Sequence, residues 1–156
     1  MIEYDIPGHG IIRAEYLVLD YNGTLAVDGV LIHGVPEMLE RIARSIQVHV
    51  VTADTFGLAG SQLADTACRL SILEPGGQDL QKVRYISSLG AERVIAVGNG
   101  RNDSLMLKQS AVGISVIQAE GASSEALISS DIICTSILDA LDIILNPLRM
   151  TATLRC

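Results

Sequence analysis

Short runs of consecutive apolar residues alternate along most of this chain with segments that mix apolar and polar residues. The runs at 16–19 (YLVL) and 94–97 (VIAV) are apolar at every position, a pattern typical of parallel strands that are covered on both faces. The expected strands are 16–20, 46–52, 71–73, 94–97, 112–116 and 132–134. The expected helices are 36–44, 57–68, 79–89, 104–109 and 136–145. This alternation predicts an α/β fold with a doubly wound parallel sheet.

Turn residues and proline positions refine this pattern. Residues 2–6 and 11–13 flank Pro7-Gly8-His9-Gly10, which predicts an N-terminal hairpin. Residues 25–27 and 30–32 are expected to pair as a small flap hairpin. Asp79 is expected to cap one helix, and the last helix is expected to stop before Pro147. The tail after it is expected to pack on the N-terminal hairpin or on a neighbouring molecule.

The length and the net charge of the chain limit the classes of protein to which it can belong. The 156 residues suit one domain, 1–156. A net charge of −7 argues against a nucleic-acid or anionic membrane surface, and no apolar run reaches the roughly 18 residues of a membrane span. The three cysteines form no CxxC pair, which favours a reduced, cytoplasmic protein.

Polar residues follow several of the apolar runs. Asp20 ends the first expected strand, Thr52 ends the second, and the loop 98–103 (GNGRND) follows the fourth. Ligands of doubly wound sheets lie outside the carboxyl ends of the strands. A carboxylate there can attack phosphorus, while a lysine such as Lys82 and Mg²⁺ neutralise the phosphoryl charge. Asp20, the carbonyl of Asn22 and an oxygen of the 99–103 loop are candidate Mg²⁺ ligands.

The order of these groups resembles the four motifs of the haloacid-dehalogenase (HAD) superfamily. The matching residues are Asp20-x-Asn22-Gly23-Thr24, Thr52, Lys82 and Gly98-Asn99-Gly100-Arg101-Asn102-Asp103. The resemblance covers about 16–134. Within it, residues 97–116 are similar to the hinge motif of P-type ATPases, so the nearest group is that of small soluble proteins related to the P-type ATPase phosphorylation domain.

The resemblance implies a Mg²⁺-dependent phosphatase that works through an aspartyl phosphate on a small phosphorylated substrate. The implied catalytic residues are Asp20, Asn22, Thr52 and Lys82. The implied phosphate-binding residues are Thr52, Ala53, Lys82 and Gly23. The implied metal ligands are Asp20, Asn22, Asn99 and Asp103.

Two residues depart from the family pattern. Phosphatases of the superfamily usually have an aspartate as general acid and base where this chain has Asn22, and an amide cannot carry a proton. They also usually have an aspartate at the position of Asn99, as a metal ligand. We therefore expect weak metal binding and slow turnover. The alternative is a weakened phosphate-binding or regulatory module.

The spacing of the motifs leaves no room for a cap domain. Asp20 to Thr52 and Thr52 to Lys82 are each only about 30 residues, which the core elements fill. Capless relatives often cover the site by assembly, so a homo-oligomer, dimer or tetramer, is expected. Arg84 and Lys108 are alternatives to Lys82. A dinucleotide loop at 98–103 is disfavoured because Asp103 occupies the last glycine position, and the order of motifs does not fit a receiver domain.

Overall fold

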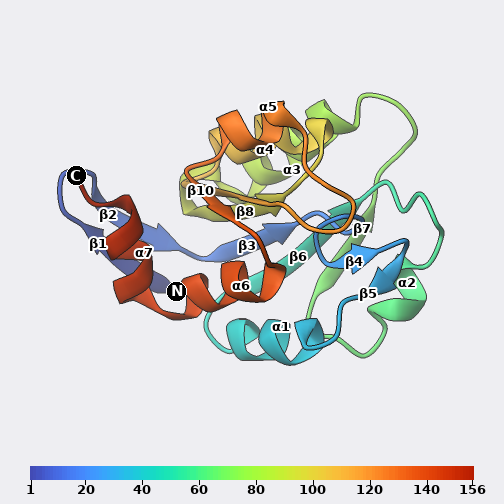
Figure 1. Ribbon diagram of the computed structural model, residues 1–156, viewed down its shortest axis with the longest axis horizontal. Helices are drawn as coiled ribbons and strands as arrows, with labels where there is room; N and C mark the ends of the chain where they lie inside the picture. Colours follow the sequence, from blue (N-terminus) through green and yellow to red (C-terminus); the bar gives the residue numbers. More distant parts are fainter.

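A six-stranded parallel sheet forms the centre of the computed structural model, which describes all 156 residues (Figure 1). The strand order is β10-β9-β8-β3-β6-β7. The strands are β3 (Tyr16–Leu19), β6 (Gln47–Thr52), β7 (Arg69–Ile72), β8 (Val94–Gly98), β9 (Val112–Val116) and β10 (Ile132–Cys134). The chain begins the sheet at β3, builds outward to β7, and then returns to β8 on the other side of β3. The predicted doubly wound α/β architecture is confirmed.

Helices cover both faces of this sheet (Figure 1). On one face lie α1 (Val35–Ala43) and α6 (Ile137–Leu145); on the other lie α3 (Gln78–Leu89), α4 (Ser104–Gln109) and α5 (Ser124–Ser129). Leu17 and Leu19 of β3 enter one apolar core, and Val18 enters the other. Successive residues of a strand point to opposite faces, so a strand between two cores must be apolar at every position. No helix has both the length and the apolar character needed to cross a bilayer.

The N-terminal hairpin packs against the C-terminal helix. It consists of β1 (Ile2–Ile6) and β2 (Gly10–Ala14), paired antiparallel, and it is covered by α7 (Pro147–Leu154). The Tyr4 hydroxyl donates to the carbonyl of Ile144 at 2.8 Å, and the Thr151 hydroxyl donates to that of Asp5 at 3.0 Å. The tail thus occupies one of its two predicted places, but its helix was not predicted, because Pro147 begins a helix here rather than only ending one.

The flap hairpin is short and is fastened at several points. It consists of β4 (Ala26–Val27) and β5 (Val30–Leu31). The Tyr21 hydroxyl donates to the carbonyl of Gly29 at 2.9 Å. The backbone N–H of Asp28 donates to Glu120 at 2.8 Å. These contacts hold the hairpin beside the carboxyl ends of β3 and β6 (Figure 1).

Two helix predictions need correction, and a second helix besides α7 was not predicted. The helix predicted at 57–68 is only α2 (Ala59–Gln62), since Gly57 and Gly60 weaken a helix and the Thr66 hydroxyl bonds back to the carbonyl of Leu63. Asp79 does not cap α3, because Gly77 occupies the cap position and Asp79 lies in the first turn. Helix α5 was not predicted; the hydroxyl of Ser123 accepts the N–H of Ala126 and caps it.

Candidate functional site

The predicted site residues meet at the carboxyl edge of the three central strands, β8, β3 and β6. A pocket of about 180 Å³ lies there. It is lined by Asp20, Asn22, Thr52, Ala53, Thr55, Gln78, Asn99, Gly100 and Asn102. This edge lies beside the point where the strand order reverses, where ligands of open α/β sheets bind. Thr55, Gln78 and Asn102 were not predicted as lining residues, since none is charged or follows directly from a strand.

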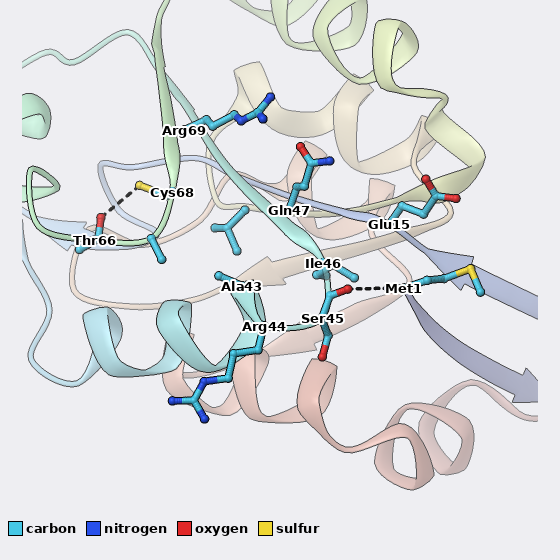
Figure 2. Close-up of a pocket in the computed structure, with 12 residues that line it drawn as sticks. Met1, Glu15, Ala43, Arg44, Ser45, Ile46, Gln47, Thr66, Cys68 and Arg69 are labelled. Carbon is cyan, nitrogen blue, oxygen red and sulfur yellow. Dashed lines mark hydrogen bonds between the residues drawn. The ribbon is translucent and has the colours of Figure 1, made fainter.

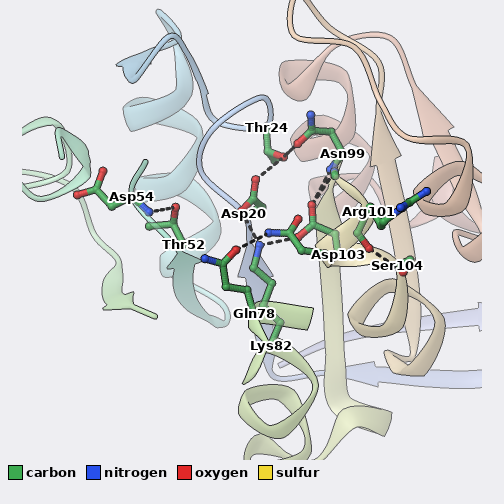
Figure 3. Close-up of polar contacts among 12 residues, drawn as sticks. Asp20, Thr24, Thr52, Asp54, Gln78, Lys82, Asn99, Arg101, Asp103 and Ser104 are labelled. Carbon is green, nitrogen blue, oxygen red and sulfur yellow. Dashed lines mark hydrogen bonds and ion pairs between the residues drawn. The ribbon is translucent and has the colours of Figure 1, made fainter. Parts of the chain in front are cut away.

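Below the pocket, Lys82 of α3 lies between two carboxylates (Figure 3). Its Nζ is 2.6 Å from Oδ1 of Asp20 and 2.6 Å from Oδ1 of Asp103. The side chain of Lys82 is fully buried. Burial lowers the pKa of Lys82, but the adjacent Asp103 and Asp20 outweigh that effect and hold it above its ordinary value. Lys82, rather than the predicted alternatives Arg84 and Lys108, is therefore the fixed positive charge beside Asp20.

Asp103 organises the loop that follows β8. Its Oδ2 accepts the backbone N–H of Asn99 at 3.0 Å and that of Gly100 at 2.8 Å, while its Oδ1 is bound to Lys82. The side chain has no exposed surface. Asp103 therefore has no accessible oxygen in this arrangement for the direct metal binding that was predicted. Glycine is needed at position 98 to leave room for the Asp103 side chain, since a Cβ there would lie 2.5 Å from Cγ of Asp103.

Asp20 keeps one carboxylate oxygen for the pocket. Its Oδ1 is bound to Lys82, and the side-chain contact of its Oδ2 is a long one, 3.5 Å, with the Thr24 hydroxyl. The backbone N–H of Tyr21 also lies beside the carboxylate. Burial raises the pKa of Asp20, and the neighbouring Asp103 raises it further; Lys82 and the Tyr21 N–H lower it and offset part of this, and the result is about 6. A second cation or a donor group beside Oδ2 would favour the ionised, nucleophilic form.

A tight turn presents Asn22 to the pocket. The backbone N–H groups of Thr24, Leu25 and Ala26 all donate to the carbonyl of Tyr21. The Oδ1 atom of Asn22 is buried and has no hydrogen-bond partner. An unpaired buried acceptor costs about 1–3 kcal/mol, so a donor group or a cation in the pocket would satisfy it.

Thr52 has a hydroxyl proton to offer. Its Oγ1 accepts the backbone N–H of Asp54 at 2.9 Å, so its proton is free for a ligand oxygen. Asp54 itself has a positive φ of 50°, and its carboxylate accepts the N–H groups of Leu58 and Ala59. Asp54 thus shapes the loop that carries Thr52 and Ala53.

Asn99 is engaged at both ends of its amide. Its Oδ1 accepts the Thr24 hydroxyl at 3.2 Å, and its Nδ2 donates to the carbonyl of Gly121 at 2.9 Å. Gly23, with φ 77°, gives it room, since a Cβ at Gly23 would lie 2.2 Å from Asn99 Nδ2. The amide is therefore suited to this place in a way that a carboxylate is not, because an aspartate would face the Gly121 carbonyl without a proton to donate.

The oxygen donors at the pocket fit a hard cation. The carboxylate of Asp20, the oxygens of Asn22 and the Oδ1 of Asn99 are of the type that Mg²⁺ prefers. The unpaired Oδ1 of Asn22 agrees with such an occupant. No group of three or more acidic, histidine or cysteine side chains that could hold a metal ion is present in the structure. Asp20 is the one charged residue that lines the pocket, so the protein share of negative charge there is small.

Two other cavities differ in their position relative to the site pocket. One, of about 610 Å³, lies at the amino ends of β6 and β7 (Figure 2), opposite the edge where ligands of this fold bind. There the N-terminal amine donates to the carbonyl of Ser45. The other, of about 670 Å³, shares Gln78 and Asn102 with the site pocket. Only this second cavity adjoins the candidate site.

Comparison with solved structures places the fold. The chain is similar to the cobalt-bound deoxy-D-mannose-octulosonate 8-phosphate phosphatase of Haemophilus influenzae, with a TM-score of 0.72 and 14% identity over 90% of this chain and 92% of that one. It is similar to the 3-deoxy-D-manno-octulosonate 8-phosphate phosphatase of Moraxella catarrhalis, in complex with magnesium, phosphate and the sugar acid, with a TM-score of 0.67 and 16% identity over 90% and 91%. A haloacid dehalogenase-like hydrolase of Streptococcus pneumoniae matches with a TM-score of 0.59 and 12% identity over 84% and 98%. The chain therefore has the core fold of the HAD hydrolases, without an inserted cap domain, as predicted.

Sequence comparison adds a nearer relative. No protein-family model matches the chain. The uncharacterized protein MJ0073 of Methanocaldococcus jannaschii is 44% identical over 84 residues, which are 51% of this chain and 90% of that protein. The chain belongs to the same family as MJ0073.

Proposed function

We propose that this chain is a slow, divalent-metal-dependent phosphatase that passes the phosphoryl group of an ester through Asp20. The observation that carries the proposal is the pairing of Asp20 with the buried Lys82, which leaves Oδ2 of Asp20 directed to a small polar pocket. A nucleophile held by a fixed cation, beside a hydroxyl donor such as Thr52, suits an acceptor of phosphoryl groups. The structural neighbours that act on phosphate esters have the same fold.

The reaction has two displacements. In the first, Oδ2 of Asp20 forms a bond to phosphorus, the bond from phosphorus to the ester oxygen breaks, and the leaving oxygen takes a proton from water. In the second, water attacks phosphorus, the bond to Asp20 breaks, the attacking water gives up a proton to solvent water, and inorganic phosphate leaves. Asn22 can orient that water but cannot take its proton, so the second step is slow.

Each remaining group has one task in this scheme. The Thr52 hydroxyl holds a phosphoryl oxygen, and the backbone at Ala53 allows close approach. Lys82, buried below the pocket, offsets the developing charge through its contact with Asp20. Gly23 does not line the pocket and instead leaves room for the Asn99 side chain. Mg²⁺, held by oxygens of Asp20, Asn22 and Asn99, would neutralise the phosphoryl charge. Asp103 keeps Lys82 and the 98–103 loop in position.

The test is hydrolysis of an aryl phosphate with Mg²⁺ by the wild type and by Asp20→Asn. We expect slow release of phosphate by the wild type, none by the variant, and a hydroxylamine-sensitive phosphoenzyme in the wild type detected by intact mass. Asp65→Asn, which changes an exposed carboxylate remote from the pocket, is the matched control. Activity that survives Asp20→Asn would exclude Asp20 as the nucleophile.

A second candidate function is a phosphate-binding or regulatory module. It is favoured by the amide of Asn99, which is bonded to the Gly121 carbonyl where the family usually has a carboxylate ligand, and by the amide of Asn22. Binding of phosphate or of beryllofluoride with Mg²⁺, in a wild type that has no turnover, would select this candidate.

A further inference from the structure

Residues 117–123 join β9 to α5 and pass beside the turn that follows Asp20; we name this segment the strap. Four of its groups bind the site from outside. The carbonyl of Gly121 accepts the Asn99 amide, and the N–H of Ser123 donates to the Asn99 carbonyl at 2.8 Å. Glu120 accepts the N–H of Asp28 in the flap hairpin. The fourth group is the side chain of Gln118, which has no role in the proposed phosphoryl transfer.

Gln118 connects three separate parts of the chain. Its Nε2 donates to the carbonyl of Thr24 at 2.8 Å and to that of Gly23 at 3.3 Å. Its Oε1 accepts the N–H of Ile137, at the start of α6, at 2.8 Å. Both ends of the amide are thus used, and the side chain spans from a helix terminus to the turn that presents Asn22.

The turn needs an external support on this side. Its own N–H groups are used within the turn: those of Thr24, Leu25 and Ala26 donate to the carbonyl of Tyr21, and that of Gly23 donates to the carbonyl of Ala26. Gly23 lacks a side chain that could hold it and has a positive φ. Gln118 supplies donors to the two carbonyls of the turn. Movement at Gly23 and Thr24 would displace Asn22 on one side and the Thr24 hydroxyl, near Asp20, on the other.

We propose that Gln118 is a positioning residue for phosphoryl transfer, which acts by fixing the carbonyls of Gly23 and Thr24 so that Asn22 and Asp20 keep their places. This inference rests on the proposed function for its catalytic part. It assigns no contact between Gln118 and the substrate. A misplacement of about 1 Å at reacting groups can cost on the order of 100-fold in rate.

The test uses Gln118→Glu, which keeps the side-chain length and the acceptor for Ile137 but sets a carboxylate against the two carbonyls. We expect backbone amide exchange in residues 23–26 to become about 10- to 100-fold faster, because hydrogen bonds that hold the turn are lost. We expect kcat for an aryl phosphate with Mg²⁺ to fall about tenfold while KM changes less, as for a group that acts through the geometry of the reacting atoms. Gln118→Met, which is neutral and of similar size, gives the same readings if the charged variant does not fold.

Gln81→Glu is the matched control, since the Gln81 amide makes the same pattern of bonds to a different loop, donating to Glu74 and Gly76 and accepting from Glu74. Amide exchange in residues 23–26 is expected to be unchanged in Gln81→Glu.

Unchanged amide exchange in residues 23–26 of both Gln118 variants would overturn the proposal, as would faster exchange with unchanged kcat. A wild type without turnover would refute the proposed function separately. In that case the affinity for beryllofluoride with Mg²⁺ is measured in place of kcat. Binding about tenfold weaker in Gln118→Glu than in the wild type supports the positioning role, and equal binding overturns it.

Discussion

Replacement of Asp20 by asparagine is expected to stabilise the metal-free protein at neutral pH while it removes the proposed nucleophile. In the fold, burial and the nearby Asp103 raise the pKa of Asp20 from its ordinary 3.8 to about 6. The native state therefore holds its proton more tightly than the unfolded chain does. The stabilising contribution of that proton is fully present below pH 3.8 and is lost as the pH rises through 6, and the difference corresponds to about 3 kcal/mol.

Asparagine resembles the protonated acid in size and carries no charge at any pH. Asp20→Asn should therefore match the wild type near pH 4 and exceed its free energy of unfolding by up to about 3 kcal/mol at pH 8. Urea unfolding in EDTA at several pH values measures this difference, and the exposed Asp65→Asn controls for a general charge effect. A variant that is less stable than the wild type at pH 8, or a difference that does not vary with pH, would refute the reasoning. Addition of Mg²⁺ should then stabilise the wild type more than the variant.

Other substitutions test the rest of the site. Lys82→Met leaves Asp20 and Asp103 as unpaired buried carboxylates and is expected to cost about 3–5 kcal/mol at neutral pH, with a smaller cost in acid, as urea titrations would reveal; equal stability would contradict the buried ion pairs. Asn22→Asp supplies the missing proton carrier and is expected to raise turnover of an aryl phosphate by about 100-fold or more, whereas an unchanged rate would show that proton transfer does not limit it. Asn99→Asp adds a carboxylate but loses the bond to Gly121, so titration calorimetry should find tighter Mg²⁺ binding together with a lower melting temperature. Light scattering is expected to find a homo-oligomer, since no cap covers the site, and a clean monomer would contradict that expectation.

The sheet was predictable because its strands are buried on both faces. Runs such as 94–97 have no polar position, and few other structures accept that pattern in a short segment. Short helices were less predictable. α2 is only one turn long because glycines interrupt it, and α5 depends on a serine cap whose signal, Ser123 before Ser124-Glu125, is common in loops as well.

The residues of the site were predictable where they end strands or carry charge. Asp20 and Thr52 share one edge because the carboxyl ends of neighbouring parallel strands lie side by side, and Lys82 reaches Asp20 from helix α3. The state of Asp103 was not predictable, since its accessibility depends on two backbone N–H groups that the loop turns toward it. Gln118 was missed for a related reason: its partners are main-chain carbonyls 94 and 95 residues away, which leave no pattern in the sequence.

For the proposed phosphatase, the pairing of one lysine with two aspartates also favours an order of ligand binding. When both carboxylates are ionised, they and the single ammonium group leave the pocket floor with an excess of one negative charge. A phosphate dianion that approaches the resting protein meets repulsion, while a divalent cation meets attraction and reverses the sign of the local charge. Metal first and phosphate second is therefore the electrostatically favoured sequence, and the cell's supply of free divalent cation, rather than the level of the ester alone, would set how often the pocket is filled.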